Sequence, residues 1–481
     1  MALEDLSPAL LWKHFEKLCS IPRPSGHEKK AVDYVVALAQ KWGMEYVCDE
    51  VNNVIVRKKA SPGFENRRGV ILQSHLDMVP QKNEGTVHDF LTDPIVPFVD
   101  GEWVRARGTT LGADNGIGAA AALAVLEDTS LAHGPLEALF TVDEESGMTG
   151  AMNLASGVLR GSALVNLDTE DEGEVYIGCA GGVDVLIDIP VSREPVQEGV
   201  AFALAVRGLK GGHSGLDINL GRGNAIRVLV RCLYKAANDF GLRIDSVRGG
   251  SVRNAIPREA FSEVVLPEGK ASEFRQYVRD FETTVKTELQ VADPAVEVTV
   301  DSVSVPQSVL TFGSQLKLLR ALYSCPNGVI RMSDRVKGVV ETSGNLAMIA
   351  SEDEKVEVQC LLRSSVDSAR DDLCCAVESA FAPAGAMVDF SGGYPGWDPD
   401  PQSSLLRTMK QVYRDLFGNE PQVKVVHAGL ECGIIKAKYP DLELVSVGPT
   451  IRYPHSPDER VHIGSVGKFW SYLVGTLAEI Q

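Results

Sequence analysis

The feature that most constrains this chain is the motif His75-Leu76-Asp77, which closely follows the apolar run 70–72. Such a run predicts a buried strand, and open α/β sheets place their chemistry just beyond the carboxyl ends of their strands. Because His75 and Asp77 are two positions apart, their side chains point the same way in an extended chain. An imidazole and a carboxylate can therefore share one site there, although a hydrogen-bonded histidine beside a helix-capping aspartate would give the same pattern.

The same arrangement, an apolar strand that ends in a carboxylate or an imidazole, recurs three times along the chain. The predicted strands and the polar residues that follow them are 139–142 with Asp143, Glu144 and Glu145; 163–167 with Asp168; and 442–447 with His455. If the strands are parallel neighbours, these side chains meet at one edge of the sheet. An isolated Glu-Glu pair is more often a solvated acidic turn, but the strand that enters it favours a chemical role.

A further carboxylate precedes the Ala-rich helix predicted over 117–126. Asp114 or Asn115 could cap that helix, since both residue types are favoured at helix starts. If Asp114 instead joins the histidines and the other carboxylates, the set matches the ligand preferences of zinc or a related divalent ion. It suffices for two metal ions that share one bridging carboxylate.

The length of 481 residues predicts two domains, because single cores stop growing below that size. The glycine cluster 178–182 marks a boundary, and the strands and helices predicted after it form a self-contained α+β pattern. We therefore expect a catalytic domain in two parts, 1–183 and 395–481, with a lid domain inserted at 184–394. The predicted fold class is α/β, with a mixed sheet flanked by helices in the catalytic domain and an α+β lid.

The composition limits the partners of the protein. A formal net charge of -18 argues against a nucleic-acid surface, and no apolar run approaches membrane-spanning length. The first residues include Glu4 and Asp5 and lack a basic region followed by an apolar core, so we expect no signal peptide. The nine cysteines form neither a disulfide framework nor a zinc-finger spacing, which suits the reducing cytoplasm.

Longer strings of residues carry a resemblance to a known family. They are 75–79 (HLDMV), 109–118 (TTLGADNGIG), 143–145 (DEE), 166–168 (NLD), 211–215 (GGHSG), 253–257 (RNAIP), 427–433 (HAGLECG) and 454–459 (PHSPDE). The chain resembles, over essentially its whole length, the co-catalytic zinc peptidases that include carnosinases and glutamate carboxypeptidases. Leu167 departs from that pattern, where a small polar residue is expected, but it only precedes the ligand.

The resemblance implies a role for each residue of the proposed centre. Asp114 would bridge two Zn²⁺ ions, with Co²⁺ or Mn²⁺ as substitutes. Glu145 and His455 would complete one metal site, and His75 and Asp168 the other. Glu144 would be the general base, and Asp77 would fix the tautomer of His75. The family also implies a cis peptide bond between Asp114 and Asn115.

The resemblance extends to the lid. It implies that His213 donates to the oxyanion of the tetrahedral intermediate, while Asn254 and Arg363 hold the substrate and its terminal carboxylate. A guanidinium fits a carboxylate with two hydrogen bonds, although a surface salt bridge is an equal alternative for Arg363. His213 lies in a glycine-rich segment that could cradle a phosphate, but the following Lys-Ser/Thr of such loops is missing.

The expected function is hydrolysis of a broad range of unblocked dipeptides, including Xaa-His substrates such as carnosine, by a cytoplasmic homodimer. One alternative is an N-acyl amino acid deacylase on the same metal centre. Another is a non-catalytic peptide-binding protein, which the presence of Glu144 together with every ligand disfavours.

Overall fold

A computed structural model describes residues 3–481, and in it the chain forms two compact units. Unit 1 consists of the described residues of Met1–Cys179, Trp397–Val425 and Leu430–Gln481, whereas unit 2 consists of Ala180–Gly396 and Val426–Gly429. The sequence prediction placed the two boundaries at 183 and 394. None of the helices in residues 3–481 combines the length and the apolar composition needed to cross a bilayer.

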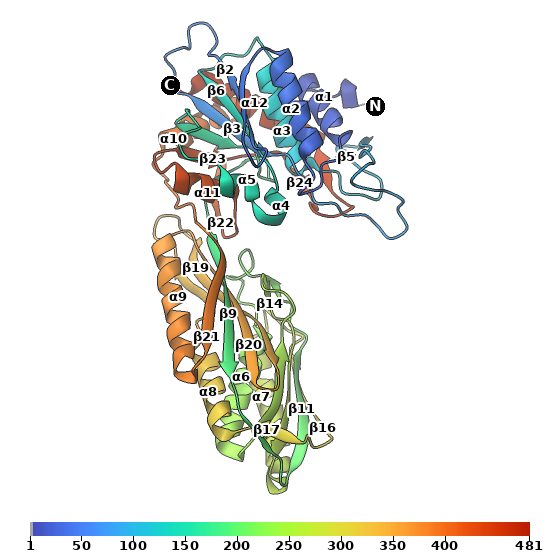
Figure 1. The fold of residues 1–481 in the computed structure, drawn as a ribbon, viewed down its shortest axis with the longest axis vertical. Coiled ribbons are helices and arrows are strands. Elements are labelled where there is room, and N and C mark those ends of the chain that lie inside the picture. Colours follow the sequence, from blue (N-terminus) through green and yellow to red (C-terminus); the bar gives the residue numbers. More distant parts are fainter. Residues whose placement is uncertain (1–2) are drawn as a thin grey trace. The chain divides into compact units, whose positions relative to one another are not determined.

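Within the described residues, unit 1 contains an eight-stranded mixed sheet (Figure 1). Its strands, in spatial order, are β1 (Glu45–Cys48), β2 (Val54–Lys58), β6 (Leu136–Thr141), β3 (Val70–His75), β7 (Ala163–Asn166), β23 (Glu443–Ser446), β8 (Glu174–Cys179) and β22 (Gln422–Val426). Strands β6, β3, β7 and β23 lie next to one another in the sheet and run parallel to one another. The expectation that the strands leading to the polar motifs are parallel neighbours is therefore confirmed.

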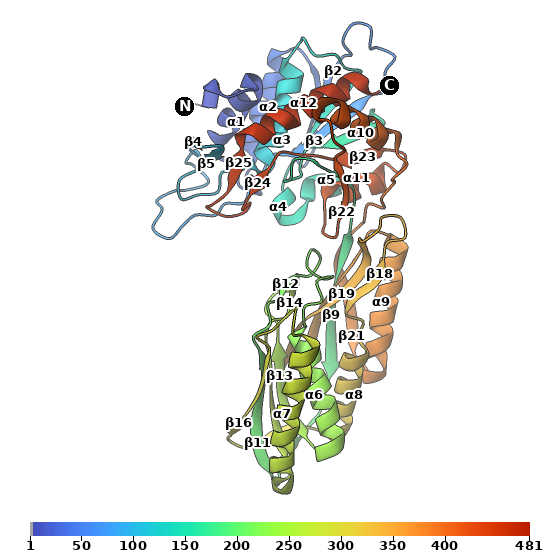
Figure 2. The same cartoon turned by 180° about the vertical axis from the view of Figure 1, so that it is seen from behind.

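Helices cover this sheet. They are α1 (Ala9–Cys19), α2 (Lys29–Lys41), α3 (Ala113–Glu127), α4 (Glu144–Gly147), α5 (Thr149–Asn153), α10 (Ser404–Phe417), α11 (Glu431–Lys438) and α12 (Ile463–Glu479). Helix α3 packs against β3 and α1, and its run of alanines, fully buried at 119–122, permits this close approach. Figure 2, seen from behind, shows α10 and α12 in front of the sheet. A small sheet in the same unit joins β24 (Ile451–Arg452), β25 (Arg460–His462), β5 (Trp103–Arg105) and β4 (Phe98–Asp100).

Unit 2 is built on an antiparallel sheet with helices packed against it (Figure 1). The strands are β16 (Glu297–Val303), β11 (Val200–Arg207), β15 (Ala260–Leu266), β13 (Arg243–Gly249), β19 (Val340–Ser351), β20 (Lys355–Ser364), β9 (Gly181–Pro190), β21 (Met387–Tyr394) and β18 (Gly328–Met332). The helices are α6 (Ala225–Phe240), α7 (Ala271–Glu288), α8 (Phe312–Ser324) and α9 (Asp367–Phe381). Apolar residues from both layers form one continuous core.

Two short strand pairs complete unit 2. Strand β10 (Arg193–Pro195) pairs with β17 (Ser308–Leu310), and β12 (Gly212–His213) pairs with β14 (Ala255–Ile256). The second pair connects two of the motifs found in the sequence, the glycine-rich segment around His213 and the segment 253–257. The fold class predicted from the sequence, a helix-flanked mixed sheet with a separate α+β unit, is confirmed.

Candidate metal centre

The candidate centre lies at the carboxyl ends of the parallel strands of unit 1. His75 is the last residue of β3, and Asp168 follows the last residue of β7 by two positions. Glu144 and Glu145 open α4, just beyond the end of β6, and His455 lies in the connection between β24 and β25. The sheet therefore brings together side chains that are up to 380 positions apart in the sequence.

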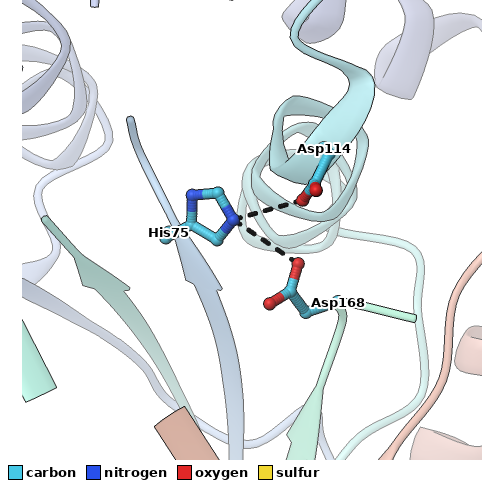
Figure 3. Close-up of side chains that lie close together, drawn as sticks. All are labelled: His75, Asp114 and Asp168. Atoms are coloured by element: carbon cyan, nitrogen blue, oxygen red, sulfur yellow. Dashed lines mark hydrogen bonds and ion pairs between the residues drawn. The ribbon is translucent and has the colours of Figure 1, made fainter. Parts of the chain in front are cut away.

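Asp114 lies between the two histidines. Its Oδ1 is 3.2 Å from His75 Nε2, and its Oδ2 is 3.3 Å from His455 Nε2. Asp168 Oδ1 is 3.5 Å from the same nitrogen of His75, and Figure 3 shows both carboxylates directed at that nitrogen. Glu145 Oε2 is 3.0 Å from His455 Nε2. The result is two ligand groups that share Asp114.

The expected helix-capping role of Asp114 or Asn115 is wrong. The carboxylate oxygens of Asp114 face the two histidines, and Oδ1 of Asn115 is buried without a hydrogen-bond partner, so neither side chain accepts a hydrogen bond from the start of the helix. The amide of Asn115 donates to Leu167 O at 2.7 Å, which ties this loop to the segment that carries Asp168. The peptide bond between Asp114 and Asn115 is cis, as the family resemblance implied.

Asp77 connects the first histidine to the Glu144-Glu145 segment. Its Oδ1 lies 3.2 Å from His75 Nδ1 and accepts a hydrogen bond from Glu144 N at 3.0 Å. Its Oδ2 accepts from Glu145 N at 3.1 Å and from Ser25 Oγ at 2.8 Å. Although burial opposes its charge, His75 and these hydrogen bonds lower the pKa of Asp77 to about 2. A charged Asp77 leaves Nε2 of His75 directed at the other carboxylates.

The remaining carboxylates crowd one another. Burial, followed by the charges of nearby carboxylates, raises the pKa of Glu144 well above its ordinary value. Burial together with Asp114 and Glu145 also raises the pKa of Asp168 to about 7, despite the opposing effect of His75. Hydrogen bonds to Asp114 and Glu145 raise the pKa of His455 to about 11. The raised pKa values of Glu144 and Asp168 thus reflect repulsion between buried carboxylates, which a bound cation would relieve.

These side chains fit divalent metal ions. Three sets of potential ligand atoms lie within 4.8 Å of one another: His75, Asp114 and Asp168; Asp114, Glu145 and His455; and His75, Glu144 and Glu145. Glu145 Oε1 is buried without a hydrogen-bond partner, so it is open to a ligand bond. Imidazole and carboxylate are the donor types that zinc and related ions accept. Asp143 and His455 also adopt positive φ values of 55° and 57°, a conformation that is uncommon for non-glycine residues and that clusters at functional sites.

Sequence reasoning missed four charged residues around this centre. Arg23 and Glu459 are buried and bind the backbone of the loop before Asp114. Burial raises the pKa of Glu431 to about 7 despite the opposing charge of His75. Burial, followed by the charges of Asp114 and Asp168, raises the pKa of Glu170 to about 8. The only sequence signal for Glu431 and Glu459 was their place in the matched strings 427–433 and 454–459.

Unit 2 holds the other predicted site residues. Nδ1 of His213 accepts hydrogen bonds from the backbone N–H groups of Gly215 and Leu216, at 3.1 and 3.0 Å. The proton of the neutral ring therefore resides on Nε2, which can donate. Burial, and next the charge of Arg363, lowers the pKa of His213, which favours this neutral form.

Asn254 and Arg363 are positioned by the sheet of unit 2. Asn345 on β19 donates to the carbonyl of Ala255 at 2.8 Å and holds the segment around Asn254, whose own side chain is exposed. Arg363 on β20 is buried, donates from Nη1 to the hydroxyl of Tyr394 at 3.0 Å, and has no partner for Nε. A surface salt bridge, the alternative role for Arg363, is therefore wrong.

His427 lies in the same unit; the sequence predicts a structural role for it by default, although it belongs to the matched string 427–433. Its Nε2 is 2.7 Å from Ser343 Oγ, and its buried Nδ1 has no hydrogen-bond partner. Burial, then the charges of Arg363 and His213, lower its pKa to about 3, so the ring is neutral.

Comparisons with known proteins agree on one group. The family model described as peptidase family M20/M25/M40 matches residues 71–479. The chain is 48% identical over 479 residues to the cytosol non-specific dipeptidase of Escherichia coli (strain K12), covering 99% of both proteins. The crystal structure of the aminoacylhistidine dipeptidase from Vibrio alginolyticus superposes with a TM-score of 0.97 at 48% identity, covering 100% of this chain and 98% of that one. The aminopeptidase PepT from Bacillus cereus shares the fold, with a TM-score of 0.59 at 15% identity over 99% of each chain.

Proposed function

This chain belongs to peptidase family M20/M25/M40, and from that premise we propose that it is a metal-dependent dipeptidase that hydrolyses a broad range of unblocked dipeptides, including Xaa-His. The observation that carries the proposal is the pair of ligand groups that share Asp114. The full-length similarity to the Escherichia coli and Vibrio alginolyticus dipeptidases supports the substrate class. The name of the Escherichia coli relative supports a cytosolic location.

We assign two Zn²⁺ ions to the centre. Asp114 would hold both ions, His75 and Asp168 would complete one site, and Glu145 and His455 the other. When bound, the ions supply Lewis acidity, which lowers the pKa of water and polarises a carbonyl oxygen. Asp77 keeps the proton of His75 on Nδ1, so that Nε2 is available as a ligand.

Glu144 is the proposed general base. It adjoins Glu145 in the chain, and its backbone N–H is held by Asp77. Its raised pKa suits a group that takes a proton from water and gives it to the leaving amine near neutral pH. Glu145 cannot take this role, because its carboxylate is directed at His455 and is assigned to a metal ion.

The residues of unit 2 would act on the substrate. His213 would donate from Nε2 to the oxygen of the tetrahedral intermediate, which the hydrogen bonds to its Nδ1 favour. Arg363, with its unpartnered Nε, would bind the terminal carboxylate, and Asn254 would hold the peptide. We further propose that the protein forms a homodimer.

The test is hydrolysis of carnosine, alanyl-alanine and an N-acetyl amino acid by the purified protein, before and after treatment with a chelator and readdition of zinc. We expect cleavage of the two dipeptides only, lost with the chelator and restored by zinc. Cleavage of the acetylated substrate instead would assign the protein to the N-acyl amino acid deacylases. Absence of all cleavage by the zinc-loaded protein would favour a non-catalytic peptide-binding role.

A further inference from the structure

Glu459 binds the loop that carries Asp114. Its side chain is 2% exposed and accepts hydrogen bonds from four successive backbone N–H groups. Oε2 accepts from Leu111 and Gly112, at 2.7 and 2.9 Å, and Oε1 accepts from Ala113 and Asp114, at 2.7 and 3.2 Å. Because Glu459 follows His455 by only four positions, it connects the segments that carry these two candidate ligands.

Arg23 binds the same loop through its carbonyl side. Its side chain is 1% exposed. Nη2 donates to Gly112 O at 2.6 Å, and Nη1 donates to the carbonyls of Leu76 and Asp77, both at 2.9 Å. Arg23 therefore connects the loop before Asp114 to the residues that directly follow His75.

The loop is shaped to admit the guanidinium group. A Cβ atom at Gly112 would lie 2.7 Å from Arg23 Nη2 and 2.8 Å from Met78 Sδ, and one at Gly116 would lie 2.6 Å from Arg23 Nη2. Gly112 also has a φ of 70°, which other residues rarely adopt. Any side chain at these two positions would displace Arg23, so the glycines and the arginine form one unit.

We propose that Glu459 and Arg23 are positioning residues that together set the place of Asp114 relative to His75 and His455. The inference rests on the proposed function, because it concerns ligands of the proposed metal ions. One buried carboxylate holds the N–H groups of residues 111–114, and one buried guanidinium holds a carbonyl of the same loop. Each also reaches a segment that carries a histidine ligand.

Position matters here because Asp114 serves both ligand groups. Its two oxygens are 3.2 and 3.3 Å from the two histidines, so a shift of this loop would disturb both groups at once. Hydrogen bonds to a charged partner are the strong ones in a buried setting, and a guanidinium fork fixes direction as well as distance. A neutral side chain at 459, or a side chain without the planar fork at 23, would hold the loop less tightly.

The test is the affinity of the full chain for zinc, measured by competition with a chromophoric chelator, in the variants Glu459→Gln and Arg23→Lys. Glutamine keeps the shape of Glu459 but turns an NH2 group toward N–H donors. Lysine keeps the charge of Arg23 but lacks the planar fork. We expect each variant to bind zinc about 10- to 100-fold more weakly, the range found when residues that hold metal ligands in place are mutated.

The matched control is Glu137→Gln. Glu137 on β6 is also buried, and it accepts from Arg57 Nε at 2.9 Å and from the backbone N–H groups of Arg160 and Gly161 at 2.6 and 2.8 Å. It lies near the start of β6, whereas the candidate centre lies beyond the end of that strand. We expect all three variants to unfold at a lower temperature than the wild type, because each alters a buried hydrogen-bonded charge, but Glu137→Gln should bind zinc like the wild type.

The outcomes separate the inference from the proposed function. Wild-type affinity for zinc in both folded variants would overturn the inference alone, since Glu459 and Arg23 would then serve stability only. The same would follow if Glu137→Gln weakened zinc binding equally. A wild-type chain that binds no zinc would overturn the proposed function and this inference with it. If Glu459→Gln does not fold, Arg23→Lys decides.

Discussion

Exchange of Glu144 for glutamine is the sharpest test of the proposed chemistry. The side chain keeps its size, and the backbone N–H of residue 144 can still donate to Asp77. What the variant loses is the ability to take a proton. A positioned general base contributes about 10²- to 10⁴-fold to a rate, or about 3 to 5 kcal/mol of transition-state stabilisation. We expect the turnover number for alanyl-alanine to fall by about 10²- to 10⁴-fold or more.

The structure also predicts what does not change. Burial and the charges of nearby carboxylates disfavour the ionised form of Glu144, so a neutral side chain removes a repulsion. The metal-free variant should therefore unfold at a temperature no lower than the wild type. Because Glu144 is assigned as a base and not as a metal ligand, the zinc content of the Glu144→Gln variant after dialysis should match that of the wild type.

The neighbouring carboxylate supplies the control. Glu145 Oε2 lies 3.0 Å from His455 Nε2 and its Oε1 has no partner, so Glu145→Gln should lose zinc as well as turnover. Steady-state kinetics and elemental analysis of both variants make the comparison. Loss of zinc from Glu144→Gln would identify Glu144 as a ligand, and undiminished turnover would show that it is not the base.

Three further predictions concern other parts of the chain. His213→Ala should lower the turnover number about 10²- to 10³-fold without loss of zinc, as expected for an oxyanion donor, and an unchanged rate would exclude His213 from the mechanism. A dipeptide with an amidated C-terminus should be a poor substrate in steady-state assays if Arg363 binds the carboxylate; efficient turnover of the amide would refute that assignment. Glu443→Gln should destabilise the fold by about 1 to 2 kcal/mol in urea unfolding at pH 7, because the carboxylate accepts from Arg68 and from Ser404 at the start of α10. Although burial opposes its charge, these hydrogen bonds lower the pKa of Glu443 to about 2. Its contribution to the free energy of unfolding is therefore present above about pH 4, the ordinary pKa range of a glutamate, and is lost as the pH falls toward 2. Equal stability of the variant and the wild type at pH 7 would contradict the prediction.

The pattern of apolar strands that end in polar residues predicted the edge of the sheet at which the candidate ligands meet, because that pattern is local in the sequence. An apolar run followed at once by His75 or closely by Asp168 specifies both a buried strand and the polar group beyond it. The parallel arrangement of β3, β7 and β23 then follows from the rules of α/β sheets. The roles of these residues as ligands stay predictions until a metal ion is bound and measured.

The local rules failed where distant groups compete for the same side chains. The sequence Ser25 to Glu28 resembles a helix-capping box, but the hydroxyl of Ser25 donates to Asp77 Oδ2. Glu28 Oε1 accepts instead from the N–H groups of Gly26 and Asp143. Ser25 and Glu28, which precede α2, are thus bonded to Asp77 and to the backbone of Asp143, beside the candidate centre. No spacing rule within the helix could predict partners 52 and 115 positions away.

Arg23 and Glu459 escaped prediction for a related reason. Their partners are backbone groups, which carry no residue-type signal in the sequence. Arg23 reaches carbonyls 53 to 89 positions away, and Glu459 reaches N–H groups 345 to 348 positions away. Only the folded loop shows that an arginine in a Pro-Arg-Pro string has a structural partner so remote.

A buried polar row beneath the candidate ligands explains why the central strands are not wholly apolar. Gln73 Nε2 donates to Glu431 Oε2 at 2.7 Å, and Thr141 Oγ1 donates to the same oxygen at 2.7 Å. Asn166 donates to Gln73, and Ser446 donates to Asn166. The row therefore crosses β6, β3, β7 and β23, two positions before His75 and Asp168.

Such a row is costly to bury unless its groups are paired, so its presence requires a reason. Apolar side chains would fill the same space but would tolerate small slips between strands. Paired amides and hydroxyls do not, because each slip would leave a buried polar group without its partner. Ligands that come from separate strands must be held to a fraction of an ångström, and only a fixed register can do this. The polar row thus fixes the register of the strands that lead to His75 and Asp168, while Arg23 and Glu459 are bonded to the loop that carries Asp114.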